Sequence, residues 1–170
     1  MCPKSDSAFT CGVECGAMKT LAAIAAFSLV LIAATPTLSQ QIDPGFRGFW
    51  TLNVDKSDFG SRAKPKTGLV NWGEHGWTFA ILTPDGRMYA DAVQTDHGCT
   101  LIGVFTDFSC EVELVTPRHV RLTMKQGEVV RRVGDIKLLD DGTTQTIHHV
   151  TSANGASYVE KTIWEKQVRK

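Results

Sequence analysis

The feature that most constrains this fold is a series of short alternating apolar and polar runs, separated by glycine turns. The turns are Asp85-Gly86, His97-Gly98, Gln126-Gly127, Asp141-Gly142 and Asn154-Gly155. Glycine favours tight hairpin turns because it adopts the positive φ that many of them require. Between the turns, apolar residues alternate with the period of a strand and show no helical repeat. From residue 40 onward, the pattern therefore predicts an all-β fold.

The alternating runs predict a meander of about eight to ten antiparallel strands. Because the turns join nearest neighbours, we expect an up-and-down arrangement that closes into a barrel and so removes its edges. Gly134-Asp135 predicts a bulge or bend in one long strand. The expected strands cover 46–54, 68–72, 77–83, 87–94, 99–104, 108–115, 119–125, 128–139, 143–152 and 157–167.

An export signal is expected before the strands. The apolar run 21–34 follows Lys19 and precedes Pro36 and small residues, the pattern of a secretory signal cleaved after about Ser39. The run is shorter than the roughly 20 residues that span a bilayer, so no stable membrane insertion is expected after cleavage. Met18 offers a conventional start for this signal, with Met1 as the alternative. We expect 1–39 to be a dispensable leader plus signal, and 40–170 to be one barrel domain, periplasmic or secreted.

Cysteine and charge content further limit the class of protein. Cys99 and Cys110 remain after the expected cleavage, and two cysteines in an oxidising compartment usually pair. The chain carries 18 basic and 18 acidic residues. This balance, without basic runs, argues against nucleic acid or an anionic membrane as a partner.

The segment that opens the first expected strand predicts a structural role. Gly48 and Trp50 lie two positions apart and face the same side of a strand, so Trp50 can plug one barrel end where Gly48 leaves room. Asn53, with Asp55 and Ser57, can bond to nearby backbone amides at the strand's exit. Phe59 can then fold back over the barrel mouth. We interpret this segment as a structural clasp.

These residues also carry a family resemblance. Gly48-Phe49-Trp50 resembles the Gly-x-Trp signature of the first lipocalin strand. The segment 50–60 resembles the W-x-L-N-x-x-K-S-x-F opening of small exported bacterial proteins of mostly unassigned function, and 158–166 resembles their last strand. The resemblance implies a lipocalin-like barrel in the bacterial envelope. It carries over no catalytic residue, and the two cysteines are not part of the family pattern.

The inward faces of the strands supply the candidate ligand-binding residues. A barrel of about eight strands is either filled by side chains or holds one small ligand. Three arginines, Arg121, Arg131 and Arg132, lie on strands, and one facing inward can pair with a ligand carboxylate. A solid core is the alternative. The predicted ligand-binding set is Trp77, Phe79, Met88, Leu122, Met124 and Arg121.

The sequence favours a non-catalytic protein without metal or cofactor. Glu74-His75 and Asp96-His97 are acid/base pairs in expected turns, where solvated side chains are common. His148 and His149 point to opposite strand faces, and nothing in the histidine spacing enforces a zinc site.

Three functions follow, in order of preference. The first is an exported lipocalin-like protein that binds a small apolar or amphipathic ligand. The second is a solid barrel that acts through its outer surface as an envelope interaction or inhibitor-like module. The third is a small hydrolase or isomerase that uses a turn histidine and carboxylate.

Overall fold

Ten antiparallel strands build the structure, a computed structural model that describes residues 41–96 and 98–168. A 3₁₀ turn, η1 (Pro44–Phe46), precedes them. The expected leader and signal lie outside the described residues. No helix within the described ranges has the length and hydropathy needed to cross a membrane. The strands are β1 (Gly48–Asp58), β2 (Thr67–Trp72), β3 (Gly76–Leu82), β4 (Met88–Gln94), β5 (Thr100–Gly103), β6 (Ser109–Thr116), β7 (His119–Gln126), β8 (Val129–Leu138), β9 (Thr144–Thr151) and β10 (Ser157–Lys166).

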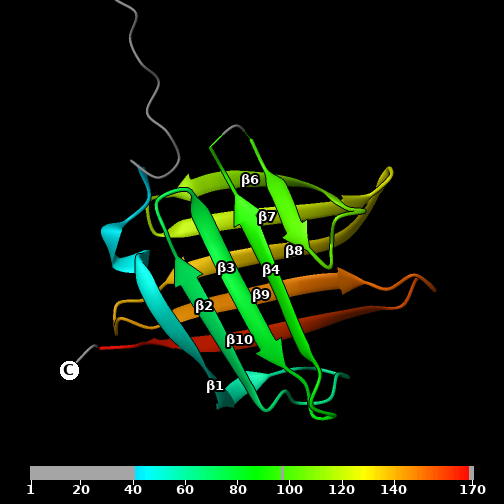
Figure 1. Cartoon of the computed structure of the whole chain (residues 1–170), viewed down its shortest axis with the longest axis horizontal. Helices are drawn as coiled ribbons and strands as arrows, with labels where there is room; N and C mark the ends of the chain where they lie inside the picture. The colour runs from blue at the N-terminus through cyan, green and yellow to red at the C-terminus, as the bar shows by residue number, and fades with distance from the viewer. Residues whose placement is uncertain (1–40, 97, 169–170) are drawn as a thin grey trace, which may run out of the picture. The chain divides into compact units, whose positions relative to one another are not determined.

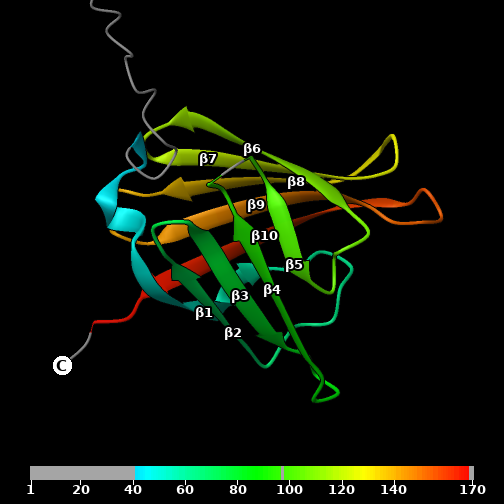
Figure 2. The same ribbon diagram turned by 45° about the horizontal axis from the view of Figure 1, so that its top comes forward.

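The strands form a nearly closed barrel with the order β5-β4-β3-β2-β1-β10-β9-β8-β7-β6. Successive strands pair as hairpins from β1 to β5 and from β6 to β10, and β1 pairs with β10, where Leu52 lies opposite Trp164. In Figures 1 and 2 the β2–β4 strands cross in front of β7–β10 at a steep angle. The predicted antiparallel meander is therefore confirmed, and the barrel that it forms is nearly closed.

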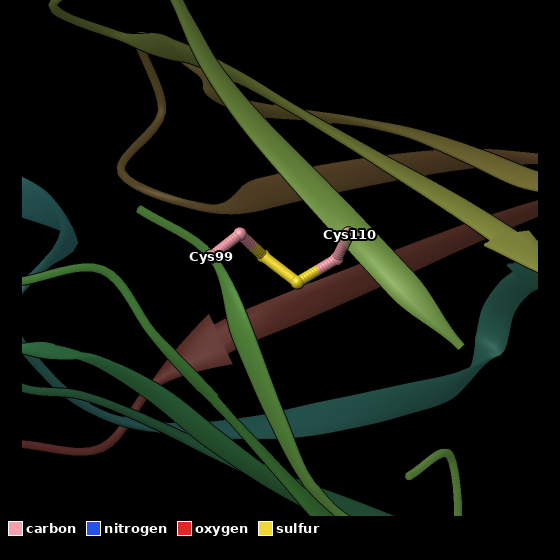
Figure 3. Close-up of a disulfide and its surroundings, with 2 residues drawn as sticks. All are labelled: Cys99 and Cys110. Carbon is pink, nitrogen blue, oxygen red and sulfur yellow. A yellow bond between two sulfur atoms is a disulfide. The ribbon is translucent and has the colours of Figure 1, made fainter. Parts of the chain in front are cut away.

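One seam interrupts the hydrogen-bonded wall. β5 and β6 are the two ends of the strand order, so no ladder joins them in the described part of the chain. A disulfide spans this seam from Cys99, immediately before β5, to Cys110 on β6, with 5.4 Å between the Cα atoms (Figure 3). The predicted pairing is confirmed, and its place shows what it does: it ties together two edges that backbone bonds leave separate.

Strand alternation places one set of side chains inside the barrel. On β7, Val120, Leu122 and Met124 are buried, while the residues between them are partly exposed. The same alternation runs through the other long strands. The buried apolar core is Phe46, Trp50, Leu52, Phe59, Trp72, Trp77, Val93, Leu101, Val120, Leu122, Met124, Ile136 and Trp164.

Trp50 plugs one barrel end, as the sequence predicted. Its side chain is 1% exposed, and its indole Nε1 donates a hydrogen bond of 2.7 Å to the carbonyl of Phe46 on η1. The role predicted for Gly48 is wrong, because a Cβ added there would meet nothing closer than 3.7 Å. Glycine is required at this position by its φ of 109° instead.

The clasp after Trp50 forms, but the strand does not end where the sequence indicated. The Asn53 side chain accepts from the Lys56 amide and donates to Glu165. Ser57 Oγ donates to the Asn53 carbonyl and accepts from the buried Ile163 amide at 2.9 Å. Pairing with β10 resumes at Asp58 after a register irregularity. The expected exit at residue 54 is therefore a bulge inside a longer β1, which leads to the buried Phe59.

The bulge predicted at Gly134-Asp135 lies elsewhere on β8. Gly134 pairs regularly with Leu122, and the register shifts where Arg132 lies opposite Met124 and Val130 lies opposite Lys125. The extra residue is therefore Arg131. Gly134 instead leaves space inside the barrel for the side chain of His148 on β9.

Candidate functional site

Aromatic rings fill the barrel end beside η1. The rings of Phe46 and Trp72 lie 4.9 Å apart, and those of Trp72 and Trp77 stack at 4.5 Å. Together with Trp50, they leave this end closed. A ligand would therefore enter from the opposite end, where 59–66, 104–108 and the turns after β7 and β9 lie.

An internal cavity of about 120 Å³ lies between the closed end and this mouth. Its lining is mostly apolar, with a smaller set of polar groups. The lining residues are Leu52, Phe59, Arg62, Pro65, Val70, Trp72, Trp77, Phe79, Ile81, Val93, Leu101, Phe105, Leu122, Met124, Arg132, Ile136, Thr144, Thr146, His148, Glu160, Thr162 and Trp164.

The cavity wall is two-faced because different strands supply its apolar and polar parts. β1–β5 contribute apolar side chains only. β9 and β10 contribute the buried hydroxyls of Thr144, Thr146 and Thr162, with Glu160 one position closer to the mouth along the β10 face. Trp164 Nε1 donates to Thr162 Oγ1 at 3.0 Å. An amphipathic molecule matches such a wall better than a purely apolar one does.

An ion pair lies at the end of the polar wall that is nearest the mouth. Arg62, on the loop after β1, contacts Glu160 on β10, with Nη1 and Oε1 2.5 Å apart. The Glu160 side chain is 4% exposed, whereas that of Arg62 is 46% exposed. The buried carboxylate of Glu160 is therefore paired with a cation, Arg62, from the loop at the mouth.

Arg132 is the second guanidinium of the cavity wall, and it has no such partner. No carboxylate oxygen in the described part of the chain lies within 4.0 Å of its nitrogens. Its guanidinium carbon lies 5.9 Å from the ring centre of Phe105, a cation–π distance. Burial lowers the pKa of Arg132, the charge of Glu160 raises it, and Arg62 lowers it again.

His148 lies beside these charges and is neutral. Its Nδ1 is buried without a hydrogen-bond partner among the described residues. Burial holds the pKa of His148 well below its ordinary value, and the positive charges of Arg132 and Arg62 lower it further. The cross-strand neighbour is Gly134, where an added Cβ would lie 2.8 Å from Nδ1. Glycine at 134 therefore makes room for the imidazole.

Asp91 fixes the loop that carries Phe105. Its side chain is buried, and Oδ1 accepts from the Phe105 amide at 3.2 Å. Oδ2 has no partner within the described ranges. Burial raises the pKa of Asp91, although the amides of Phe105 and Val104 oppose the rise. Gly103 crosses this carboxylate closely with a φ of 129°, so a side chain there would collide with it.

A second, more open hollow of about 400 Å³ lies at the mouth. Arg62, Phe105, Met124 and Arg132 line both hollows. This shared set therefore marks the passage from the mouth to the inner cavity. The outer hollow adds Phe108, Gln126, Arg131, Val150, Thr151, Ser152, Ala153 and Tyr158.

Four of the six predicted ligand-binding residues line the inner cavity: Trp77, Phe79, Leu122 and Met124. Met88 does not, because it is 69% exposed. On β4, the face with Asp91 and Val93 turns inward instead, so the expected inward face was the wrong one. Arg121 is also misplaced, since its Nε donates to Asp135 at 3.0 Å on the outer side of β7.

The sequence analysis did not single out Arg62, His148 or Glu160 for a ligand site. Arg62 and Glu160 lie 98 residues apart, and only the fold joins them. The one local signal was His148 on an alternating strand, on the same face as Thr144 and Thr146. Among residues 41–96 and 98–168, no three histidine, cysteine or carboxylate side chains are grouped to hold a metal.

The acid/base pairs expected in turns are arranged differently. His75 Nδ1 contacts Asp96 Oδ1 at 2.7 Å across two neighbouring turns, and both side chains are largely exposed. Glu74 is exposed as well, and His97 lies outside the described residues. The pair lies at the closed end, away from the cavity mouth.

No protein-family model, curated protein or solved structure matches this chain.

Proposed function

We propose that this protein is an exported, non-catalytic barrel that binds a small apolar or amphipathic molecule in its interior. The observation that carries the proposal is the two-faced cavity, which has an apolar wall from β1–β5 and a few convergent polar groups from β8–β10. Such a combination is typical of small-molecule sites.

The size of the cavity limits the ligand. Its volume of about 120 Å³ is close to the roughly 150 Å³ of an engineered apolar cavity that binds benzene. We expect one ring or a short alkyl chain to enter the inner cavity, with the rest of the molecule in the mouth hollow. Export is supported by the Cys99–Cys110 disulfide, because such bonds persist in oxidising compartments.

Tryptophan fluorescence tests the proposal, since Trp72, Trp77 and Trp164 line the cavity. Titration with hexanol, toluene and hexanoate should give a saturable change in the emission for at least one of them. A Leu122→Phe variant, which fills space beside the cavity, should weaken that response. The matched control is Leu69→Phe on the outer face, where the side chain is 46% exposed. No saturable response across the panel would contradict ligand binding and favour an outer-surface interaction module.

A further inference from the structure

Arg132 forms no ion pair within 4.0 Å with any carboxylate of the described residues. It lies on β8 between Met124 of β7 and Val150 of β9, so its cross-strand neighbours are apolar. Regular alternation with Gly134 and Ile136 turns Arg132 inward, opposite the buried Met124. A partly buried cation with apolar neighbours is costly unless an anion pairs with it.

Among the described residues, neither nearby carboxylate contacts Arg132 directly. Glu160 is bonded to Arg62 at 2.5 Å. Asp91 Oδ1 accepts from the Phe105 amide, while Oδ2 has no hydrogen-bond partner among the described residues. The Asp91 carboxylate attracts Arg132 only from beyond 4.0 Å. His148 adds no negative charge, and its buried Nδ1 lacks a partner in the described structure. The layer between the two hollows therefore offers one cation and one imidazole without a protein partner.

The position of Arg132 suits contact with the polar head group of a ligand better than a structural ion pair within the protein. Arg132 lines both the inner cavity and the mouth hollow, whereas the Trp77 and Leu122 side chains line only the inner cavity. A molecule with its apolar part between those side chains would bring its polar end to this layer. Planar guanidinium groups bind carboxylates through two parallel hydrogen bonds.

We propose that the ligand is a small organic acid whose carboxylate pairs with Arg132 while its ring or short alkyl chain occupies the inner cavity. This inference rests on the proposed function. Arg132 and not Arg121 is then the arginine that recognises the acid, and His148 borders the head group. Phe105, held by Asp91, packs over the guanidinium and limits its access to water.

Paired acids and amides of equal shape test the inference. Phenylacetate is compared with phenylacetamide, and hexanoate with hexanamide, by calorimetry on the purified protein with its disulfide intact. Each acid should bind roughly 10- to 100-fold more tightly than its amide, the range expected for a hydrogen-bonded charge pair. In Arg132→Gln the preference should disappear, and in Arg132→Lys it should be partly kept. Arg121→Gln, on the outer face of β7, is the matched control and should bind as the unaltered protein does.

The outcomes separate the two proposals. Equal binding of acid and amide, or unchanged acid binding in a folded Arg132→Gln variant, overturns the role of Arg132 and leaves cavity binding intact. If neither the acids nor hexanol and toluene bind, both proposals are wrong. The acid and amide comparison uses the unaltered protein, so the inference stays testable even if the glutamine variant does not fold.

Discussion

Removing the Cys99–Cys110 disulfide should destabilise the barrel. The length of the loop that the bond closes predicts how much stability is lost, and the position of the bond predicts which strands loosen. The bond closes a loop with a sequence separation of 11 and joins β5 to β6, which share no backbone ladder. For a loop of this length, the chain-entropy model gives roughly 2.8 kcal/mol of stabilisation at 25 °C. For a domain of this size, such a loss corresponds to a fall in Tm of roughly 10 °C.

The assay is urea unfolding of the Cys99→Ala/Cys110→Ala protein, followed by circular dichroism and tryptophan fluorescence. The unaltered protein with its disulfide reduced serves as the matched comparison, because it loses the bond without losing the side chains. Both should lose a similar free energy of unfolding.

The position of the bond predicts where the native state loosens. β5 has four residues, and within the described structure β4 is its only ladder partner, so its amides should exchange faster with deuterium after removal of the bond. Protection in β1 and β10, which pair with strands on both sides, should persist. A loss of less than about 1 kcal/mol, or equal loss of protection in all strands, would refute the reasoning that the bond holds a seam.

Three further changes have defined outcomes. Trp50→Ala should cost about 3–5 kcal/mol of unfolding free energy, measured by urea denaturation, because it empties the plug; a loss typical of a surface site would contradict the plug. Ser57→Ala should cost about 1–3 kcal/mol because a buried amide loses its acceptor, whereas Ser61→Ala, at an exposed position, should change stability little; equal effects would contradict the clasp. The depressed pKa of His148 means that the unfolded chain takes up a proton first as pH falls below 6.5, so stability should decline there. His148→Gln should flatten this decline and the exposed His149→Gln should not; unfolding midpoints measured between pH 7 and 5 that respond equally to both changes would contradict a neutral, buried imidazole.

Strand positions could be predicted because their signals are local. Asp85-Gly86 and Asn154-Gly155 end their strands with glycines at φ of 85° and 84°, and the predicted ends lie within about two residues of the observed ones outside β1. The exit of β1 was predicted too early because the renewed pairing of Asp58 with Lys161 depends on a strand at the other end of the chain.

The residues that face the interior were harder to predict. Each strand has two faces, and the sequence indicates the inward face only through the hydrophobicity of its residues. On β4, Met88 suggested the wrong face, since an inward Asp91 becomes acceptable only when the loop around Phe105 offers an amide to it.

Arg121 could have been excluded from sequence, because it alternates with Leu122 and Met124, which were themselves predicted to face inward. Alternation with the buried Val120 and Leu122 places Arg121 on the outer face, where it meets Asp135. Arg132 lies opposite the inward Met124 and so faces the interior.

The central claim, that the barrel interior is a ligand cavity, is tested most directly by locating a bound molecule. Nuclear Overhauser effects between hexanol and the labelled methyl groups of the protein make this measurement. We predict contacts to methyl groups that line the cavity, those of Ile81, Val93 and Leu122, and none to the exposed Val129 and Val159. Contacts confined to the exposed methyl groups, or none at saturating hexanol, would contradict the claim.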